Sequence, residues 1–121
     1  MNDEYIEGYL NGLMHISSSI SNYIGPSYIE VYCYEKEELL KKYNISPTNE
    51  SLENKLNEWL GDKKLIESLL YYINNIIKEK TKIYEVNNEI DIDYTPFTFI
   101  EDSFVLETKE YMILFVLGNN E

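Results

Sequence analysis

The feature that most constrains this chain is a change in hydrophobic periodicity near Thr81. Before it, apolar residues recur every three or four positions in most segments, which is the spacing of amphipathic helices. After it, they alternate or form short continuous runs, which is typical of strands. Long helical stretches followed by a strand-rich segment, without regular alternation of the two, predict an α+β domain. At 121 residues the chain has room for one core, so we expect residues 1–121 to form a single domain.

The expected architecture is a helix-rich N-terminal two-thirds packed on a C-terminal antiparallel sheet of about four to six strands. The predicted helices are residues 3–23, residues 36–43, a segment that Thr48 and Asn49 open and Gly61 closes, and a segment that Asp62 caps and that runs to about residue 80. The predicted strands are residues 28–34, 83–86, 90–94, 97–100, 104–108 and 111–117.

Two of the predicted strands carry more detailed expectations. In residues 28–34, Ile29, Val31 and Cys33 take one face, and Tyr28, Glu30, Tyr32 and Tyr34 take the other. The last strand is almost continuously apolar, which predicts an interior position in the sheet.

Charge excludes several classes of function. The chain has 22 acidic residues against 10 basic ones, all of them Lys, for a net charge of −12. Such a charge repels phosphate, so direct binding to nucleic acid or to an anionic membrane is disfavoured. The absence of Arg removes the bidentate grip on phosphate that phosphoryl-transfer enzymes use.

The negative charge is concentrated toward the two ends of the chain. Residues 1–35 sum to −5, residues 36–83 to +1 and residues 84–121 to −8. If the strand at residues 28–34 pairs into the C-terminal sheet, both acidic ends meet on one side of the molecule.

Glu89, Asp91 and Asp93 are spaced by two residues in a strand-like stretch. Their side chains therefore point to one side, about 6.6 to 7 Å apart, which is close to the spacing of phosphates along a nucleic-acid backbone. One interpretation is a solvated strand face that prevents aggregation. The other is an acidic surface for a basic partner, to which Glu101 and Asp102 contribute and in which Tyr94 is an anchor.

The sequence offers little catalytic chemistry. His15 is the only histidine and has no nucleophile with an orienting acid nearby, and Cys33 is the only cysteine, so one chain cannot build a zinc site of His and Cys ligands. Residues 91–102 fail as a calcium loop because Pro96 stands where glycine is required. We therefore expect no catalytic residues, no metal site and no cofactor. A looser magnesium site of the Asp-x-Asp kind stays open.

The functional hypothesis is a cytoplasmic, non-enzymatic protein that covers a basic surface on a nuclease or another nucleic-acid-binding protein. The acidic N-terminus and the short apolar runs predict neither a secretory leader nor a membrane span. In size and charge the chain resembles small acidic inhibitors such as toxin immunity proteins and phage anti-defence proteins that imitate DNA. Two alternatives are a self-associating module that forms a homodimer and a carboxylate-dependent or magnesium-dependent enzyme.

Overall fold

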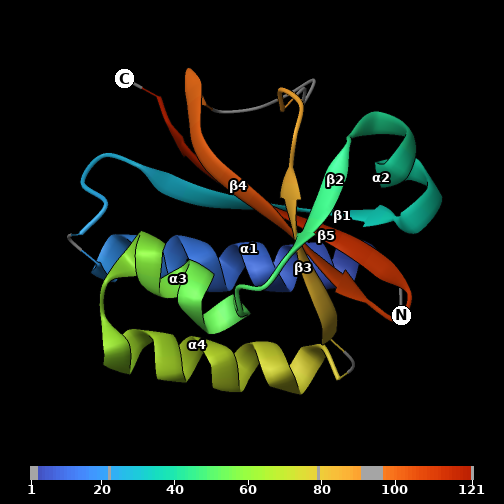
Figure 1. Cartoon of the computed structure of the whole chain (residues 1–121). Coiled ribbons are helices and arrows are strands. Elements are labelled where there is room, and N and C mark those ends of the chain that lie inside the picture. The colour runs from blue at the N-terminus through green and yellow to red at the C-terminus, as the bar shows by residue number, and fades with distance from the viewer. Residues whose placement is uncertain (1–2, 22, 79, 91–96, 121) are drawn as a thin grey trace.

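The computed structural model describes residues 3–21, 23–78, 80–90 and 97–120. Along the chain the elements are α1 (Asp3–Ile20), β1 (Tyr28–Glu35), α2 (Lys36–Lys42), β2 (Ile45–Thr48), α3 (Leu52–Leu60), α4 (Lys63–Ile76), β3 (Lys80–Val86), β4 (Phe99–Thr108) and β5 (Tyr111–Asn119). The five strands form one antiparallel sheet in the order β1-β5-β4-β3-β2 (Figure 1). The α+β class predicted from the sequence is confirmed.

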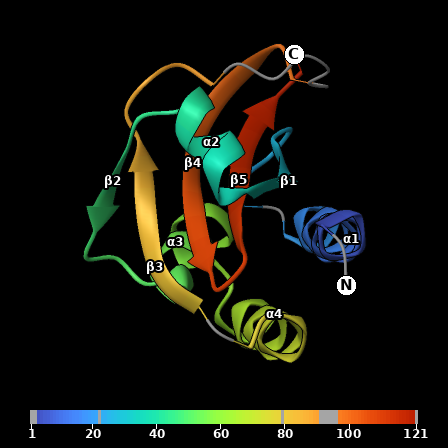
Figure 2. The same ribbon diagram turned by 90° about the vertical axis from the view of Figure 1, so that its right-hand side faces the viewer.

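The sheet has a hydrophobic cluster on each of its two faces. On one face α1, α3 and α4 pack over the strands, and α2 lies on the other (Figure 2). Three aromatic rings are in contact in the first cluster: the Phe104 ring stacks on Phe115 at 4.7 Å between centroids and lies tilted against Trp59 at 4.9 Å. The second cluster is built around Leu39 of α2 and the buried Leu114 of β5.

β1 pairs with β5 along its whole length, from Tyr28 opposite Gly118 to Glu35 opposite Tyr111. The pairing that the sequence left as a hypothesis is therefore confirmed. Burial alternates along β1 as expected: Ile29, Val31 and Cys33 are buried, and the tyrosines between them are half-buried. β5 lies between β1 and β4, as its apolar sequence predicts.

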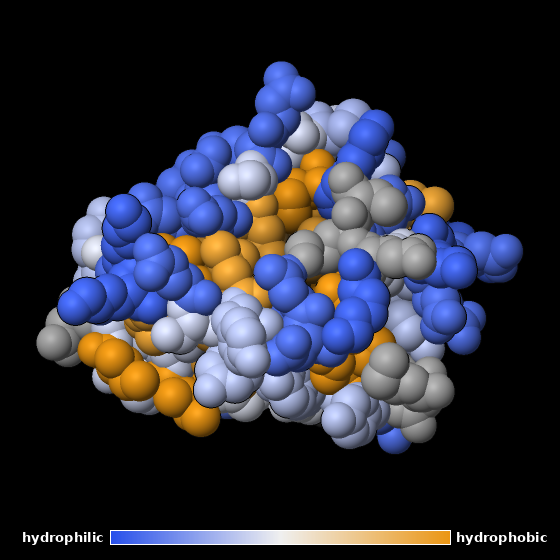
Figure 3. All heavy atoms as spheres, turned by 90° about the horizontal axis from the view of Figure 1, so that it is seen from below, coloured by the Kyte–Doolittle hydropathy of each residue, from blue (hydrophilic) through white to orange (hydrophobic). Residues whose placement is uncertain are grey.

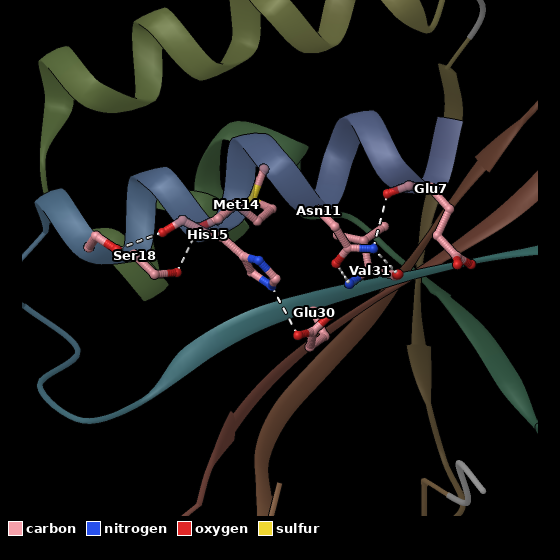
Figure 4. Close-up of polar contacts among 8 residues, drawn as sticks. Glu7, Asn11, Met14, His15, Ser18, Glu30 and Val31 are labelled. Atoms are coloured by element: carbon pink, nitrogen blue, oxygen red, sulfur yellow. Dashed lines mark hydrogen bonds and ion pairs between the residues drawn. The ribbon is translucent and has the colours of Figure 1, made fainter. Parts of the chain in front are cut away.

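The outer edge of β1 is closed by side chains of α1. The Asn11 amide donates to the Val31 carbonyl at 2.7 Å, and its oxygen accepts from the Val31 N–H at 2.7 Å (Figure 4). One turn earlier, Glu7 accepts from the Cys33 N–H at 2.7 Å. Four helical residues advance about 6 Å and two strand residues about 6.6 Å, so residues four apart on α1 match alternate residues of β1. Asn11 and Glu7 thus make hydrogen bonds of the kind that a neighbouring strand would make to β1.

Several element boundaries differ from the sequence prediction. α1 ends at Ile20 and α4 at Ile76, and β3 already begins at Lys80. The two strands predicted at residues 97–100 and 104–108 are one strand, β4, with a bulge between Ile100 and Asp102. Glu101, Asp102 and Ser103, predicted to be a connection, therefore lie within the sheet. The predicted strand at residues 90–94 falls mostly outside the described residues.

A short edge strand was missed between α2 and α3. β2 spans four residues and contains Pro47, which has no N–H to donate, so the segment gives no strand signal. The following helix begins later than predicted: Ser51 caps α3 through its hydroxyl, which accepts from the Asn54 N–H at 3.1 Å. Asp62 caps α4, as predicted, by accepting from the Leu65 N–H.

We predict that Asn11→Ala lowers the free energy of unfolding by about 2 kcal/mol, because it leaves the Val31 N–H and carbonyl without their partner. The control is Ser19→Ala, which removes only an exposed hydroxyl bond to the His15 carbonyl on the same helix and should cost less than about 0.5 kcal/mol. Urea unfolding of both variants measures the difference. Equal stability of the two variants would contradict the role assigned to Asn11.

Candidate functional site

Four of the C-terminal acids gather at the end of the sheet where β3 finishes and β4 begins. A hollow of about 710 Å³ lies there, with Lys55 of α3 in its wall. Its apolar lining includes Ile90, Phe97 and Phe99. The acidic residues that line it are Glu85, Glu89, Glu101 and Asp102.

Two further acids join this group from the middle of the chain. A neighbouring hollow of about 320 Å³ shares Glu101 and Asp102 with the first and adds Glu58. Glu50 reaches Lys55, with 3.0 Å between its Oε2 and Nζ. We call the whole group the acidic cluster: Glu50, Glu58, Glu85, Glu89, Glu101 and Asp102.

The β4 bulge positions two members of the cluster. Asp102 accepts a hydrogen bond from the Trp59 indole N–H at 2.8 Å, which ties it to α3. Glu101 accepts a hydrogen bond from the Ser27 hydroxyl, just before β1. Because the bulge breaks the simple alternation between Ile100 and Asp102, these two consecutive carboxylates line the same hollows.

Lys55 is the one basic residue among the described lining residues of the two hollows. It is only 6% exposed, and burial by itself opposes its charge. The hydrogen bond from Lys55 to Glu50 and the charge of Asp102 outweigh that effect and raise the pKa of the ammonium group. Lys55 therefore stays charged and neutralises part of the acidic cluster.

Glu50 and Glu58 titrate as an interacting pair. Hydrogen bonds with Lys55 and with Glu58 lower the pKa of Glu50. The hydrogen bond with Glu50 raises the pKa of Glu58, to which burial, the Glu50 charge and the Asp102 charge also contribute. An acid whose pKa is raised by neighbouring carboxylates is less stable ionised than it would be in water. One lysine thus does not relieve the repulsion among these carboxylates.

Of the six residues predicted to bind a partner, the structure brings three together: Glu89, Glu101 and Asp102 all line the larger hollow. Asp91, Asp93 and Tyr94 lie outside the described residues. Glu89 is exposed, whereas Asp102 is half-buried and bonded to Trp59.

The two acidic ends of the chain meet only in part. Glu7 is bonded to the β1 backbone, and Glu30 is paired with His15 at 2.9 Å between Oε1 and Nε2, so both lie along the contact between α1 and β1 (Figure 4). The acids that join the C-terminal ones come instead from the region with almost no net charge, namely Glu50 and Glu58.

A signal for this part of the site was present in the sequence. Lys55 falls on the apolar stripe of α3, between Leu52 and Trp59, where a lysine is rarely found unless it has an acidic partner. Glu58 lies one turn later on the same helix, and Glu50 lies just before it. The predicted site does not include them because residues 36–83 have almost no net charge.

Phe97 closes one side of the hollow, and a glycine makes its position possible. Its ring lies directly over Gly118 of β5, where a Cβ atom would be too close to the ring carbons. The Tyr28 ring lies 4.8 Å away between centroids. Gly118 therefore makes room for the Phe97 ring on β5.

Cys33 and His15, the residues considered for catalysis, both make contacts within the fold. Cys33 is a buried free thiol on the helix side of β1, as its place in the strand pattern predicts. His15 is about half exposed and bonded to Glu30. Within the described ranges, no three His, Cys, Asp or Glu side chains are placed to share a metal ion. The Asp-x-Asp pair considered for magnesium, Asp91 and Asp93, falls outside those ranges.

Comparisons with known protein families, curated proteins and solved structures found no match to this chain. Among the helices of the described residues, none combines the length and the hydropathy needed to cross a bilayer.

We predict that Glu58→Gln raises the free energy of unfolding at pH 7 by about 0.5 kcal/mol, a magnitude typical of exposed charge pairs. Glu58 has a raised pKa in the folded chain, so its stabilising contribution is complete below its unfolded pKa and is lost as the pH rises through the folded pKa. The gain from the substitution should therefore vanish below about pH 4, where Glu58 is protonated in both states.

Urea unfolding of Glu58→Gln at both pH values tests this expectation. Glu67→Gln, which removes one exposed acid from α4, is the matched control and should give no comparable gain. A variant less stable than the natural chain at pH 7, or a gain that persists at low pH, would show that Glu58 is not repelled by its neighbours.

Proposed function

We propose that this chain is a non-enzymatic binding protein whose acidic cluster covers a basic surface of another protein. The observation that carries the proposal is the excess of carboxylates at the end of the sheet, where the acidic cluster has six acids against one lysine, Lys55, among the described residues that line its hollows. The hydrogen bond with Glu50, burial and the charges of Glu50 and Asp102 raise the pKa of Glu58, so keeping Glu58 ionised is a cost that a chain selected only for stability would avoid. A cationic partner removes that cost on binding.

The shape of the larger hollow fits a cationic side chain. Lys and Arg carry an apolar stem below the charged group, and the hollow offers both apolar walls and carboxylates. Phe99 is 48% exposed at this position, so its ring is available for contact with an aliphatic stem or a guanidinium group. Basic side chains that project from a protein surface could therefore be held by charge and by packing.

We further propose that the partner is a protein that handles nucleic acid, such as a nuclease. Proteins of this kind carry Lys and Arg side chains arranged for phosphates, and a row of carboxylates competes for the same groups. The net charge of −12 would speed the encounter by electrostatic steering and would keep the chain itself away from nucleic acid. In this role the chain acts as an immunity or anti-defence inhibitor in the cytoplasm, where its single buried cysteine stays reduced.

The test compares two variants that lose the same number of negative charges. The cluster variant is Glu85→Gln, Glu89→Gln and Glu101→Gln, and the control variant is Glu37→Gln, Glu38→Gln and Glu67→Gln, at exposed positions on α2 and α4. The natural chain and both variants are immobilised, and proteins from a host lysate cleared of nucleic acid are captured and eluted with a salt gradient. The captured protein is then purified, and its affinity is measured with and without competing duplex DNA.

The proposal predicts that the cluster variant binds the captured partner at least about tenfold more weakly, a change of about 1.4 kcal/mol, while the control variant binds as the natural chain does. Duplex DNA should compete with the natural chain for the partner. Equal weakening by both variants would mean that only net charge matters. No weakening by either would mean that the partner binds elsewhere, and each of these two outcomes would refute the role of the cluster.

A further inference from the structure

α1 carries an exposed apolar face on the side turned away from the sheet. Ile16 is 62% exposed, and Ile20 and Tyr5 are each 59% exposed. At 3.6 residues per turn these side chains lie on one side of the helix together with Gly12. Seen from below, hydrophobic groups protrude over the C-terminal part of α1 at the lower-left rim of the molecule (Figure 3). This is a third face of the helix, distinct from the core side and from the polar side that meets β1.

Two glycines make a notch in the same face. Gly8 and Gly12 lie in the interior of α1, where glycine disfavours the helix compared with alanine. A Cβ atom added at either position would meet no heavy atom within 4 Å. No packing inside the chain therefore requires a glycine at either position, whereas a second helix could approach closely there.

We propose that this face binds a second copy of the same chain, with the two α1 helices antiparallel about a two-fold axis at Gly12. In that arrangement Ile16 of one copy lies at the level of Gly8 of the other, so this projecting side chain meets a position without one. The two Gly12 residues face each other at the axis, where the helices are closest. Such self-complementarity is what an interface between identical surfaces requires.

Charge favours the antiparallel arrangement over a parallel one. α1 contains no Lys or Arg, and its acids lie in its first two turns, where Glu4 is exposed. Parallel helices would place these acidic turns side by side. The antiparallel pair separates the two Glu4 residues by about 24 Å along the helix axis, which is beyond the screening length at physiological salt.

The available area sets the expected affinity. With about 200 Å² for each large side chain, the exposed parts of Tyr5, Ile16 and Ile20 amount to roughly 360 Å² for each chain. Complete burial of these parts on both chains would remove roughly 720 Å² from water, which is below the size of a standard interface, so the dimer should be weak, with a Kd on the order of 100 µM. The proposal shares no residue with the acidic cluster and does not rest on the proposed function.

Sedimentation equilibrium of the full chain, from about 1 to 500 µM, tests this proposal. We expect a monomer–dimer equilibrium that tightens as salt is added, because salt screens the repulsion between two chains of charge −12 while leaving the apolar contact intact. Binding through the acidic cluster would weaken with salt, so the two proposals fail or succeed separately. A chain that stays monomeric over the whole range, whether its α1 face serves another protein or none, overturns the dimer, and so does a dimer that salt dissociates.

The decisive variant is Gly12→Leu, which fills the notch at the axis. Because its Cβ meets open space, this variant should fold and unfold at a higher temperature than the natural chain, but its dimerisation should weaken at least about tenfold. The control Ser68→Leu adds a leucine at an exposed position on α4 and should dimerise as the natural chain does. Unchanged dimerisation of Gly12→Leu would overturn the proposed interface.

Discussion

The closed outer edge of β1 is the constraint on which the arrangement of this molecule depends. A strand at the edge of a sheet leaves backbone N–H and C=O groups that must find water or a partner. Here Asn11 satisfies both groups of Val31, and Glu7 satisfies the N–H of Cys33. These bonds fix the rotation of α1, which places one side of the helix in the core and leaves the side with Ile16 in solvent.

The same constraint separates the two surfaces to which we assign roles. Glu7 bonds to the Cys33 N–H and Glu30 pairs with His15, both at the contact between α1 and β1. Neither residue belongs to the acidic cluster. The cluster is built instead at the end of the sheet, where the β4 bulge and the start of α3 bring together acids that are far apart in the sequence. Lys55 offsets part of the charge, while the hydrogen bond with Glu50, burial and the charges of Glu50 and Asp102 still raise the pKa of Glu58.

The fold was largely predictable from the sequence because most of its elements have strong local signals. The capping of α4 by Asp62, the alternation in β1 and the apolar run of β5 are properties of neighbouring residues, and the structure has all three. β2 was missed because a four-residue strand with Pro47 is defined by its partner β3 and not by its own sequence. The continuity of β4 through Glu101 was missed because polar residues at a bulge look like a turn until the partner strand is known.

The candidate site was predictable only where it depends on composition. An acidic surface followed from the excess of carboxylates, and Glu89, Glu101 and Asp102 do line one hollow. Glu50 and Glu58 contribute through Lys55, a buried lysine. Glu58 lies on the same helix as Lys55, whereas Glu50 precedes that helix and Asp102 lies on β4. In the sequence this pairing leaves one sign, the lysine on the apolar stripe of α3, and none of which acids come from beyond that helix.

Amide hydrogen exchange at Val31 and Cys33 tests the central claim most directly. If α1 closes the edge of β1, both amides should be protected to within about tenfold of the β1 amides that bond to β5, because all of them would then open with the same cooperative unit. Exchange at Val31 and Cys33 close to the rate of an unstructured peptide, with the β5-bonded amides still protected, would show an open edge. That result would remove the basis for the orientation of α1 and for the exposed α1 surface derived from it.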